Sequence, residues 1–556
     1  MRLRLKTPVV VVFSSLVALA LAAVAIAATG ALTQAGCFSN SATRGCTAVP
    51  NFSLDSARGV AVSPDGTSVY VAAATSAGVG YLTTFKRASD GSLQVSSPCL
   101  GFGACDAIAH GDELIGARSV AVSPDGKNVY VAAKSVGVVA LNRAADGTLS
   151  DLSCISDGGA AGCSTHATTS LNSPAVVVVS PDGNNVYATS EFDSTITTFD
   201  RAVDGSLTQS GCFANDDPSG CSNLVRHSIK GAFGLAISPD GNSVYVAAGG
   251  ATQSATPGQS VTRFARGVGG VLTEASCLSS GGTNGCGDLT NDSLEAPRSV
   301  AVSADGKDLY VASGVDGAIS HFTLAADGSM TEADCLADFA ANGCGALANV
   351  SLGEARTVTI SPDGASVYVA SQGDDSITTF DRGANGALSQ SGCIADSGSG
   401  GCTTAATSSL RRTACGFDAV VSGCANGDSS LDGAWGVAVS PDGTSVYVTG
   451  QDADALSVFK REVPPLPPAA RDTTAPDTIF VSYKNKYSTG GVGTFVVRSD
   501  DPAATFECKV VKEFHACGAT TRVRLRGGKY TFKARAIDAA GNIDATPAVY
   551  KFKVKR

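Results

Sequence analysis

The sequence is poor in bulky and charged side chains. Its 556 residues include one Trp and two Met, and charged residues make up 16% of the chain. The 50 Asp and Glu residues outnumber the 40 Lys and Arg residues, which gives a formal net charge of −10. A chain with this balance does not coat phosphates, so we expect no nucleic-acid partner. The hydrophobic fraction of 44% also excludes a disordered acidic polymer.

Glycine is abundant, with 64 residues, which is typical of short strands joined by tight turns. One phrase recurs seven times, as in GVAVSPDGTSVYVA at 59–72 and SVAVSPDGKNVYVA at 119–132. A repeat of roughly 60 residues built from short apolar runs indicates a propeller or a solenoid. The aspartates of the seven repeated turns are Asp65, Asp125, Asp182, Asp240, Asp305, Asp363 and Asp442.

Each unit contains four strand-like runs, the third at 196–201 and the fourth at 206–209 in one example. Seven such units predict an all-β fold, a seven-bladed β-propeller. The last unit ends after its third run, at 455–460, and residues 30–34 match the fourth run of the preceding unit at 386–390. We therefore expect an N-terminal strand to close the ring, which an open solenoid would not require.

The chain divides into four segments. Residues 1–27 combine a basic start, an apolar run and a small-x-small end, and predict a signal peptide, with an uncleaved membrane anchor as the alternative. No later stretch is apolar enough to span a membrane after signal cleavage. The propeller is expected over 28–462, a proline-rich linker over 463–476 and a small β-sandwich over 477–556.

The 18 cysteines predict nine local disulfides rather than a metal site. No second close pair or His stands at zinc-finger spacing, so we predict no metal and no cofactor. Disulfides and a signal peptide together place the protein outside the cytoplasm, secreted and in one interpretation bound to the cell wall. The pairs are Cys37/Cys46, Cys99/Cys105, Cys154/Cys163, Cys212/Cys221, Cys277/Cys286, Cys335/Cys344, Cys393/Cys402, Cys415/Cys424 and Cys508/Cys517.

The face of the ring that carries the long, disulfide-bearing links is the expected functional face, because loops on a rigid scaffold usually carry function. The residue five positions before each turn serine begins the innermost strand of its blade. These residues include Arg58, Arg118, Phe233, Arg298, Arg356 and Trp435. They predict a ligand-binding arc, in which arginine forks bind an anion and an aromatic face supports a ring or sugar. In the alternative, each arginine pairs with an acid of its own loop, such as Asp55, Glu295 or Glu354.

Other polar residues of the same face leave alternatives open. His110, His166 and His227 fall in three successive interblade links, but no spacing forces them together. A set of acids lies between second and third strands and predicts either a solvated rim or a calcium site. These acids are Glu191, Asp193, Asp316, Asp374, Asp375, Asp452 and Asp454.

The repeated motifs Ser-Pro-Asp-Gly-x-x-Val-Tyr-Val-Ala, Ile-Thr-Thr-Phe-Asp-Arg and Asp-Gly-Ser-Leu-Thr resemble those of the lactonase-type, YVTN-like propeller family over residues 30–462. This family includes 6-phosphogluconolactonase-like and 3-carboxymuconate-cyclase-like proteins. The resemblance implies a cluster of Arg, His and acids at the channel mouth that acts on a carboxylated lactone or muconate. Residues 506–542 resemble bacterial Ig-like modules, which implies a β-sandwich with a hairpin disulfide.

These observations favour a monomeric binding or scaffold protein whose partner is a small anionic or sugar-like ligand or a cell-surface polymer. The alternative is a lactone hydrolase or muconate-type cyclase that uses the arginine arc. Charge also divides between the domains, because residues 472–556 carry 15 Lys and Arg against 8 Asp and Glu, a net charge of +7. Arg522, Arg524 and Arg526 share one strand face, which is either simply solvated or adheres to an anionic wall polymer.

Overall fold

The chain forms two compact units, one up to residue 462 and one from residue 476. The computed structural model describes residues 31–40, 46–49, 53–101, 105–106, 113–165, 168–215, 220–249, 259–340, 342–396, 399–404, 430–462, 476–486, 492–499, 504–511, 513–537 and 542–554. The signal-peptide prediction (1–27), His110, His166, Cys415/Cys424 and nearly all of the predicted linker fall outside these residues. None of the helices in the described ranges has the length and apolar character needed to cross a bilayer.

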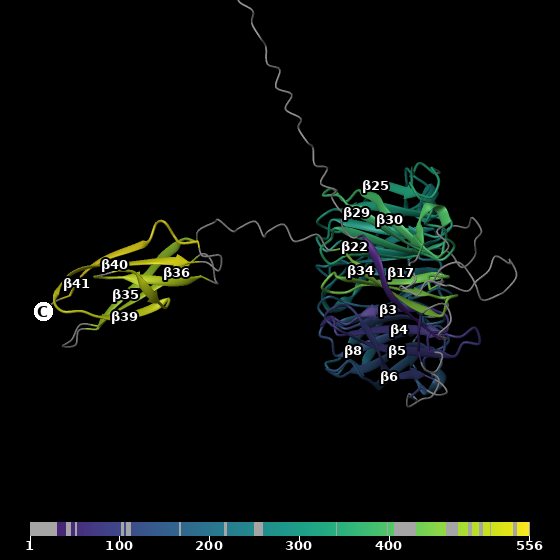
Figure 1. Cartoon of the computed structure of the whole chain (residues 1–556), viewed down its shortest axis with the longest axis horizontal. Coiled ribbons are helices and arrows are strands. Elements are labelled where there is room, and N and C mark those ends of the chain that lie inside the picture. The colour runs from purple at the N-terminus through teal and green to yellow at the C-terminus, as the bar shows by residue number, and fades with distance from the viewer. Residues whose placement is uncertain are drawn as a thin grey trace, which may run out of the picture. The chain divides into compact units, whose positions relative to one another are not determined.

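The first unit is built from one repeated sheet (Figure 1). In blade three the strands run in the order β12 (Pro174–Val179), β13 (Asn185–Ser190), β14 (Thr195–Arg201), β15 (Leu207–Ala214) and β16 (Ser222–Asn223). The turn between β12 and β13 is tight because Ser180 Oγ donates to Asp182 Oδ1 and Gly183 adopts a φ of 71°, where a side chain would be strained. The PDG motif therefore forms the turn that the sequence predicted.

The remaining blades repeat this plan. Blade one holds β3 (Ala57–Val62), β4 (Ser68–Ala74), β5 (Gly80–Arg87) and β6 (Leu93–Gly101); blade two holds β7 (Ala117–Val122), β8 (Asn128–Ala133), β9 (Gly137–Arg143), β10 (Leu149–Ser156) and β11 (Ser164–Thr165). Blade four holds β17 (Ala232–Ile237), β18 (Ser243–Ala248), β19 (Ser260–Arg266), β20 (Leu272–Ser279) and β21 (Gly287–Asp288); blade five holds β22 (Pro297–Val302), β23 (Asp308–Ser313), β24 (Ala318–Leu324), β25 (Met330–Ala337) and β26 (Gly345–Ala346). Blade six holds β27 (Ala355–Ile360), β28 (Ser366–Ser371), β29 (Ser376–Arg382), β30 (Leu388–Ala395) and β31 (Thr403–Thr404). Short 3₁₀ turns occupy Ala160–Gly162, Val268–Gly270, Ser280–Gly285 and Ser399–Gly401.

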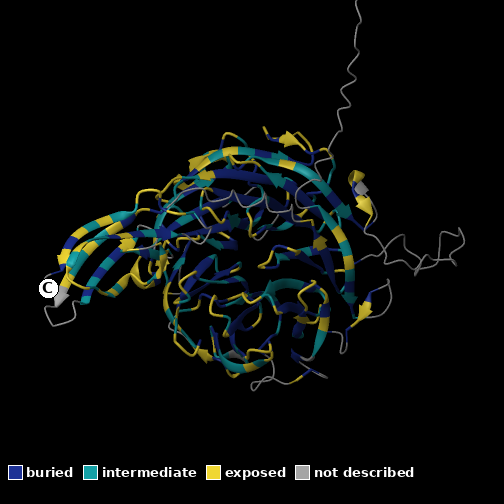
Figure 2. Ribbon diagram, turned by 60° about the vertical axis from the view of Figure 1, so that its left-hand side comes forward, coloured by how far each residue is buried: buried dark blue, intermediate teal, exposed yellow. Residues whose placement is uncertain are grey.

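The N-terminal strand closes the ring, as the repeat predicted. Blade seven contains β32 (Ala434–Val439), β33 (Ser445–Gly450) and β34 (Ala455–Arg461), and its outer strands are β1 (Leu32–Ser39) and β2 (Thr47–Ala48). Leu32 lies opposite Arg461 and Phe38 opposite Leu456 in this antiparallel pair. The inner strands contact one another in cyclic order around the axis, so the described residues form seven sheets in a closed ring (Figure 2).

The fifth strand of most blades is a feature that the sequence reading missed. It is two residues long, runs parallel to the fourth strand, and follows directly after the disulfide, as in β10 and β11 beside Cys154–Cys163. Eight of the nine predicted disulfides lie in the described residues, and all eight are formed. Each short loop therefore folds back along the blade edge, where it covers an otherwise open strand.

The hydrophobic core lies between blades rather than inside them. The seven largest clusters of buried apolar side chains in the described part of the propeller lie one at each blade interface. The tyrosine of the V-Y-V strand is fully buried, and in blade one Tyr70 donates its hydroxyl proton to the carbonyl of Gly147 in the next blade. No blade can bury both faces by itself, so closure of the ring is required for stability.

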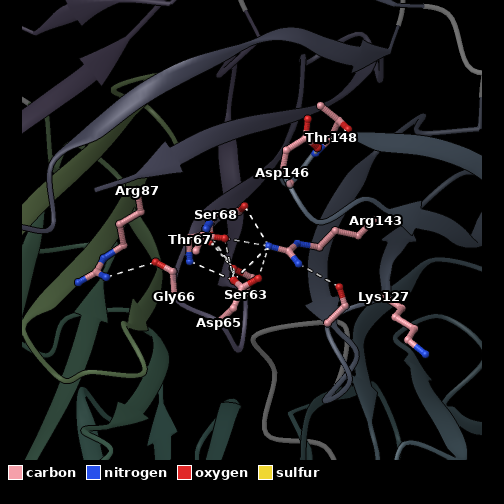
Figure 3. A network of polar contacts seen from close by, with 12 residues as sticks. Ser63, Asp65, Gly66, Thr67, Ser68, Arg87, Lys127, Arg143, Asp146 and Thr148 are labelled. Atoms are coloured by element: carbon pink, nitrogen blue, oxygen red, sulfur yellow. Dashed lines mark hydrogen bonds and ion pairs between the residues drawn. The ribbon is translucent and has the colours of Figure 1, made fainter. Parts of the chain in front are cut away.

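At six of the seven blade interfaces in the described residues, an arginine at the end of the third strand clamps a blade to its neighbour, as Arg143 does in Figure 3. Arg143 donates to Tyr70 Oη at 2.7 Å and to Asp65 Oδ2 at 2.8 Å, both in blade one. Burial alone would raise the pKa of Asp65, but hydrogen bonds from Ser63, Thr67 and Arg143 outweigh it and hold this pKa well below its ordinary value. The pairs are Arg143–Asp65, Arg201–Asp125, Arg266–Asp182, Arg382–Asp305, Arg461–Asp363 and Arg87–Asp442.

The interface between blades four and five departs from this pattern, because Leu324 stands where the other blades have the arginine. There Arg263 of blade four hydrogen-bonds across the interface to the carbonyl of Asp327. Blade five also carries a buried polar cluster. His321 Nε2 lies 2.9 Å from Asp308 Oδ1, its Nδ1 lies 3.3 Å from Asp334 Oδ2, and its ring stacks on Tyr310. Asp308 is in turn an ion-pair partner of Arg382 from blade six.

The C-terminal unit consists of two sheets that pack face to face. One sheet has the order β35 (Thr478–Lys486), β36 (Val492–Ser499) and β39 (Thr520–Arg524); the other has the order β38 (His515–Cys517), β37 (Thr505–Lys509), β40 (Gly528–Ile537) and β41 (Ala548–Val554). Phe495 and Val497 of the first sheet share a core with Cys508, Phe532 and Phe552 of the second. The predicted sandwich is therefore confirmed, with its hairpin disulfide Cys508–Cys517, whereas its kinship to Ig-like modules stays a prediction.

Replacing Arg143 by Gln tests the clamp. The variant leaves Tyr70 and Asp65 without the buried guanidinium, so we expect a loss of about 2–3 kcal/mol in the free energy of unfolding. Thermal unfolding of the oxidised protein measures it. The control is R226Q, because Arg226 is 35% exposed and pairs with Glu274 on the outer surface. Equal melting temperatures for the two variants would contradict a stabilising role for the clamp.

The pH dependence of stability tests the His321 cluster. Burial lowers the pKa of His321, but hydrogen bonds with Asp334 and Asp308 outweigh it and raise the pKa above 6.5. The folded state therefore favours the protonated ring, and the stabilisation is complete below that value and lost as pH rises through the folded-state pKa. We expect the melting temperature to fall as the pH rises above about 6.5 and through the higher folded-state pKa of His321.

A second variant replaces the cluster by the residues found in blade six. There Thr379 is equivalent to His321, and Ser366 is equivalent to Asp308. The double variant H321T/D308S should lose the part of the pH slope that His321 contributes. An unchanged slope in the double variant would contradict the assignment.

Candidate functional site

The six predicted site residues lie around one cavity on the ring axis. This cavity has a volume of about 320 Å³, and its lining includes one residue from the start of each inner strand. The residues that the sequence selected are all present: Arg58, Arg118, Phe233, Arg298, Arg356 and Trp435, with Ala175 at the seventh position. The structure thus brings them together, whereas their role in ligand binding stays a prediction.

A β-bulge at each inner strand places these residues at the cavity. In blade one the pairing with β4 shifts register between Ala57 and Gly59, so Arg58 has no partner across the ladder. The same shift occurs at Arg118 and at Arg298, and the other blades repeat it. A bulge turns the extra residue out of the sheet, and here it releases the side chain toward the axis. Farther along the inner strands the wall of the cavity is mainly apolar, with Val120, Val177 and Val300 among its residues.

Aromatic rings lie against three of the four arginines. The guanidinium carbons of Arg58 and Arg356 lie 5.3 Å and 4.5 Å from the centre of the Trp435 ring. Between blades four and five, the guanidinium carbon of Arg298 lies 5.2 Å from the centre of the Phe233 ring. Contacts of this kind hold a cation over the aromatic face without neutralising its charge. The arginines are thus ordered while their positive charge remains available.

Glu191 is the carboxylate that reaches the arginines from another blade. Its Oε2 accepts a hydrogen bond from Arg118 at 3.0 Å, and its Oε1 lies 3.7 Å from Arg298. Arg58 and Arg356 are held differently, because their Nε atoms donate to the neutral amide oxygens of Gln451 and Gln372. Among the described residues, the alternative in which each arginine pairs with an acid of its own loop is met by Arg356, which lies 2.7 Å from Glu354.

The cavity carries a surplus of positive charge. Burial, together with the charges of Arg118 and Arg356, lowers the pKa of Arg58 to about 10. Burial likewise lowers the pKa values of Arg298 and Arg356, and repulsion between these two adds to the effect at Arg356. The described lining of the cavity contains no Asp, Glu or His. The buried Nε atoms of Arg118 and Arg298 also have no hydrogen-bond partner in the described structure.

The other acids of this face serve the backbone. Asp193 Oδ2 accepts a hydrogen bond from the backbone N–H of Asn172, Asp374 Oδ2 from Gly353, and Asp375 Oδ1 from Gly433. Asp316 and Asp454 accept backbone protons in the same way, from Glu295 and Ser56. These carboxylates therefore tie the loop that enters the inner strand to a neighbouring link. In the part of the chain that the structure describes, no three of these carboxylates come together as calcium ligands would.

Metal-ligating geometry occurs at one place in the described residues, where Glu113 approaches Cys154 and Cys163. The two sulfurs are bonded to each other, so no thiolate is available as a ligand. His227, the one described member of the predicted histidine set, adopts a φ of 46°, and its carbonyl accepts a hydrogen bond from Asn215.

The partners of the arginines were missed as a group, although the sequence contains a signal for them. Glu191, Gln372 and Gln451 each stand directly after the second strand of their blade. Aligning this position across the repeats would have given a second circle of polar residues beside the first. Glu191 was instead grouped with the acids of the rim, because its contact with Arg118 crosses from one blade to another.

A second cavity of about 430 Å³ opens between blades five and six. Arg298 and Arg356 line both cavities, and Glu354, Asp316 and Phe339 complete the wall of the second. Burial raises the pKa of Asp316 to about 6, and the neighbouring carboxylates add to this shift. The two arginines therefore connect the channel mouth to a groove on the same face.

Comparison with known families places the fold. A family profile described as a seven-bladed β-propeller lactonase matches residues 104–218 and 280–399. This match supports the lactonase-type family for the propeller. No curated protein matches this chain.

Solved structures similar to this lactonase-type propeller include the periplasmic gluconolactonase of Pseudomonas aeruginosa, with 19% identity, a TM-score of 0.44, and coverage of 66% of this chain and 95% of that one. A putative 6-phosphogluconolactonase from Bacteroides uniformis ATCC 8492 has 18% identity and a TM-score of 0.42, and covers 62% of this chain and 85% of its own.

Replacing Glu191 by Gln tests the charge balance of the cavity. The variant removes the carboxylate between Arg118 and Arg298, so we expect a loss of about 1–3 kcal/mol in stability. Citrate should restore the melting temperature, because an added carboxylate can bind the guanidiniums that have lost their counter-charge. The control is E274Q, which breaks the outer pair with Arg226. Equal recovery of both variants in citrate would contradict the account.

Proposed function

We propose that this protein is an extracytoplasmic binding protein whose propeller holds a small carboxylate, of the sugar-acid class, at the mouth of the central channel. The observation that carries the proposal is the circle of residues that the seven β-bulges present to the cavity. Four guanidinium groups converge on one cavity, and the described carboxylates that reach them, Glu191 and Glu354, are too few to neutralise all four. Burial and, second to it, repulsion between the arginines lower the pKa values of Arg58 and Arg356, and a bound anion would stabilise these charges.

Size and surface chemistry favour a small ligand. A volume of 320 Å³ lies at the low end of the range of about 300–1,000 Å³ for small-molecule pockets. Guanidinium forks match a carboxylate, and the ring of Trp435 offers a flat surface to a sugar. The unpartnered Nε atoms of Arg118 and Arg298 add two donors for ligand oxygens.

The setting of the protein is part of the proposal. Eight disulfides fit an oxidising compartment, which supports the export that the N-terminal sequence predicts. We propose that the protein acts there as a monomer, secreted or held at the cell wall. The propeller then serves as a recognition platform rather than as a membrane-embedded component.

Lactone hydrolysis is the second candidate, and the family match supports it. Opening a lactone requires a group that activates water and donors for the developing carboxylate. The arginines would supply the donors, and Glu191 and Glu354 are described carboxylates beside them. Against this, both carboxylates are held by guanidiniums, and the described lining of the cavity contains no Asp, Glu or His.

The single Trp of the chain provides a direct measurement, because Trp435 lines the cavity. Titration with gluconate, galacturonate and citrate, followed by tryptophan fluorescence, should give saturable binding. R58Q should weaken it by about tenfold or more, since it removes a charged hydrogen-bond donor. The control R226Q should bind as the wild type does. An absence of saturable binding by every acid, or equal weakening in both variants, would refute the proposed site.

The same variants separate binding from catalysis. Incubation of the oxidised protein with gluconolactone and with carboxylated lactones should give no more hydrolysis than buffer if the protein is a binder. Turnover that is lost in both R58Q and E191Q, but kept in R226Q, would reject the pure binder and assign the hydrolase instead.

A further inference from the structure

The outer face of one sheet in the C-terminal unit concentrates positive charge. Strands β37, β38, β40 and β41 carry six Lys or Arg side chains and a single acidic one, Glu507. Side chains alternate along a strand, and Cys508, Phe532 and Phe552 point into the core. Their neighbours therefore point outward and form what we call the lysine face. Its basic residues are Lys509, Lys529, Lys533, Arg535, Lys551 and Lys553.

Like charges lie directly opposite each other on this face. Lys509 pairs with Lys533 across β37 and β40, and Lys529 pairs with Lys553 across β40 and β41. Cross-strand partners lie close together, so such pairs destabilise a sheet. In the described residues, Lys529 and Lys553 have no carboxylate partner, whereas Glu507 is already bound to Arg535 at 2.7 Å. The stability of the sheet does not account for this arrangement.

Apolar and aromatic surface borders the charges. Lys529, Lys551 and Lys553 line an open groove of about 700 Å³ together with Val511 and Tyr530. At the other end of the face, the Phe514 ring lies under the Lys509 ammonium, 5.7 Å from its centre, and under the Arg535 guanidinium, 4.2 Å away. Solvated lysines alone would need neither a groove nor an aromatic support.

We propose that the lysine face binds a linear anionic polymer of the cell surface, whose carboxylate or phosphate groups repeat along a hydrophilic chain. The four strands spread the cations across the sheet at intervals of about 4.8 Å, which suits repeated charges better than a single one. The eight disulfides fit a compartment in which acidic glycans and polyol phosphates are common polyanions. This site is separate from the propeller cavity and does not depend on the function proposed for it.

A nucleic acid is less suited to the face. Proteins that bind single strands present several exposed rings on which bases stack. Among the described side chains of the lysine face, Phe514 is the aromatic ring that contacts the cations. Duplex DNA and anionic vesicles are therefore comparison probes, not expected ligands.

The opposite sheet offers a matched control. Arg522 and Arg524 are exposed on β39 and also face outward. Thr494 lies between Lys484 and Arg522 across the three strands, so this sheet has no directly opposed pair of like charges there. Removing Arg522 and Arg524 changes the net charge by the same amount as removing Lys529 and Lys553, but leaves the lysine face intact.

The experiment uses the full oxidised chain and its variants K529T/K553T and R522T/R524T. Polygalacturonate, as a carboxylate polymer, and poly(glycerol phosphate), as a phosphate polymer, are immobilised, with neutral dextran as the blank. We expect at least one polymer to bind, with an affinity that falls as salt rises, since the contacts are ionic. K529T/K553T should weaken binding by about tenfold, and R522T/R524T by less than about twofold.

Thermal unfolding verifies that the variants are folded, and K529T/K553T should melt no lower than the wild type because it removes opposed charges. Preference for one polymer identifies the anion that the face recognises. Equal weakening by the two variants would overturn the proposal in favour of diffuse attraction. Failure of both polymers to bind, or tighter binding of duplex DNA or anionic vesicles, would overturn it as well. Binding of sugar acids at Trp435 is measured separately, so neither result decides the other.

Discussion

The contact between the third-strand arginine and the turn aspartate of the preceding blade is the interaction on which the propeller depends. It joins two blades through one buried guanidinium, which also bonds to the buried tyrosine hydroxyl, as Arg143 does with Tyr70 and Asp65. The contact recurs at six of the seven interfaces in the described residues. Because the core lies between blades, each clamp holds together the two surfaces that bury it. The P-D-G motif thus forms a turn within one blade and an ion pair with the next.

A rigid and nearly symmetric ring provides a place where side chains can differ without loss of the fold. The bulge at the start of each inner strand repeats around the axis, but the residue that it presents changes from Arg58 to Ala175 to Trp435. The scaffold therefore sets the position and the sequence of each blade sets the chemistry. Blade three adds Glu191, which crosses to the arginines of two other blades and partly balances their charge. Because these arginines are buried and their charges are only partly neutralised, the mouth of the channel is suited to an anion.

The two units differ in the way they carry positive charge. In the propeller, whose overall charge is negative, a few arginines are buried at a small cavity and ordered by aromatic rings. In the C-terminal unit, lysines spread over an open sheet face, with two pairs set directly opposite each other. The first arrangement suits a compact ligand with one or two anionic groups, and the second suits repeated charges on a long chain. Disulfides support both units, since each closes a short loop at a strand edge.

The sequence by itself determined the number of blades, the closing strand, the turns, the disulfide pairs and the six residues at the cavity. These follow from repetition, because equivalent positions in a cyclic array must meet at one axis, and from local pairing of cysteines nine residues apart. The sequence did not reveal the fifth strand, the pairing of Glu191 with Arg118 and Arg298, or the opposed lysines Lys529 and Lys553. Each of these depends on register or on contacts between distant segments, and only the tertiary structure decides which side chains face each other there. The periodicity of the sequence indicates on which face of a strand a side chain lies. The side chain that it contacts is set by the packing of the whole ring or sandwich.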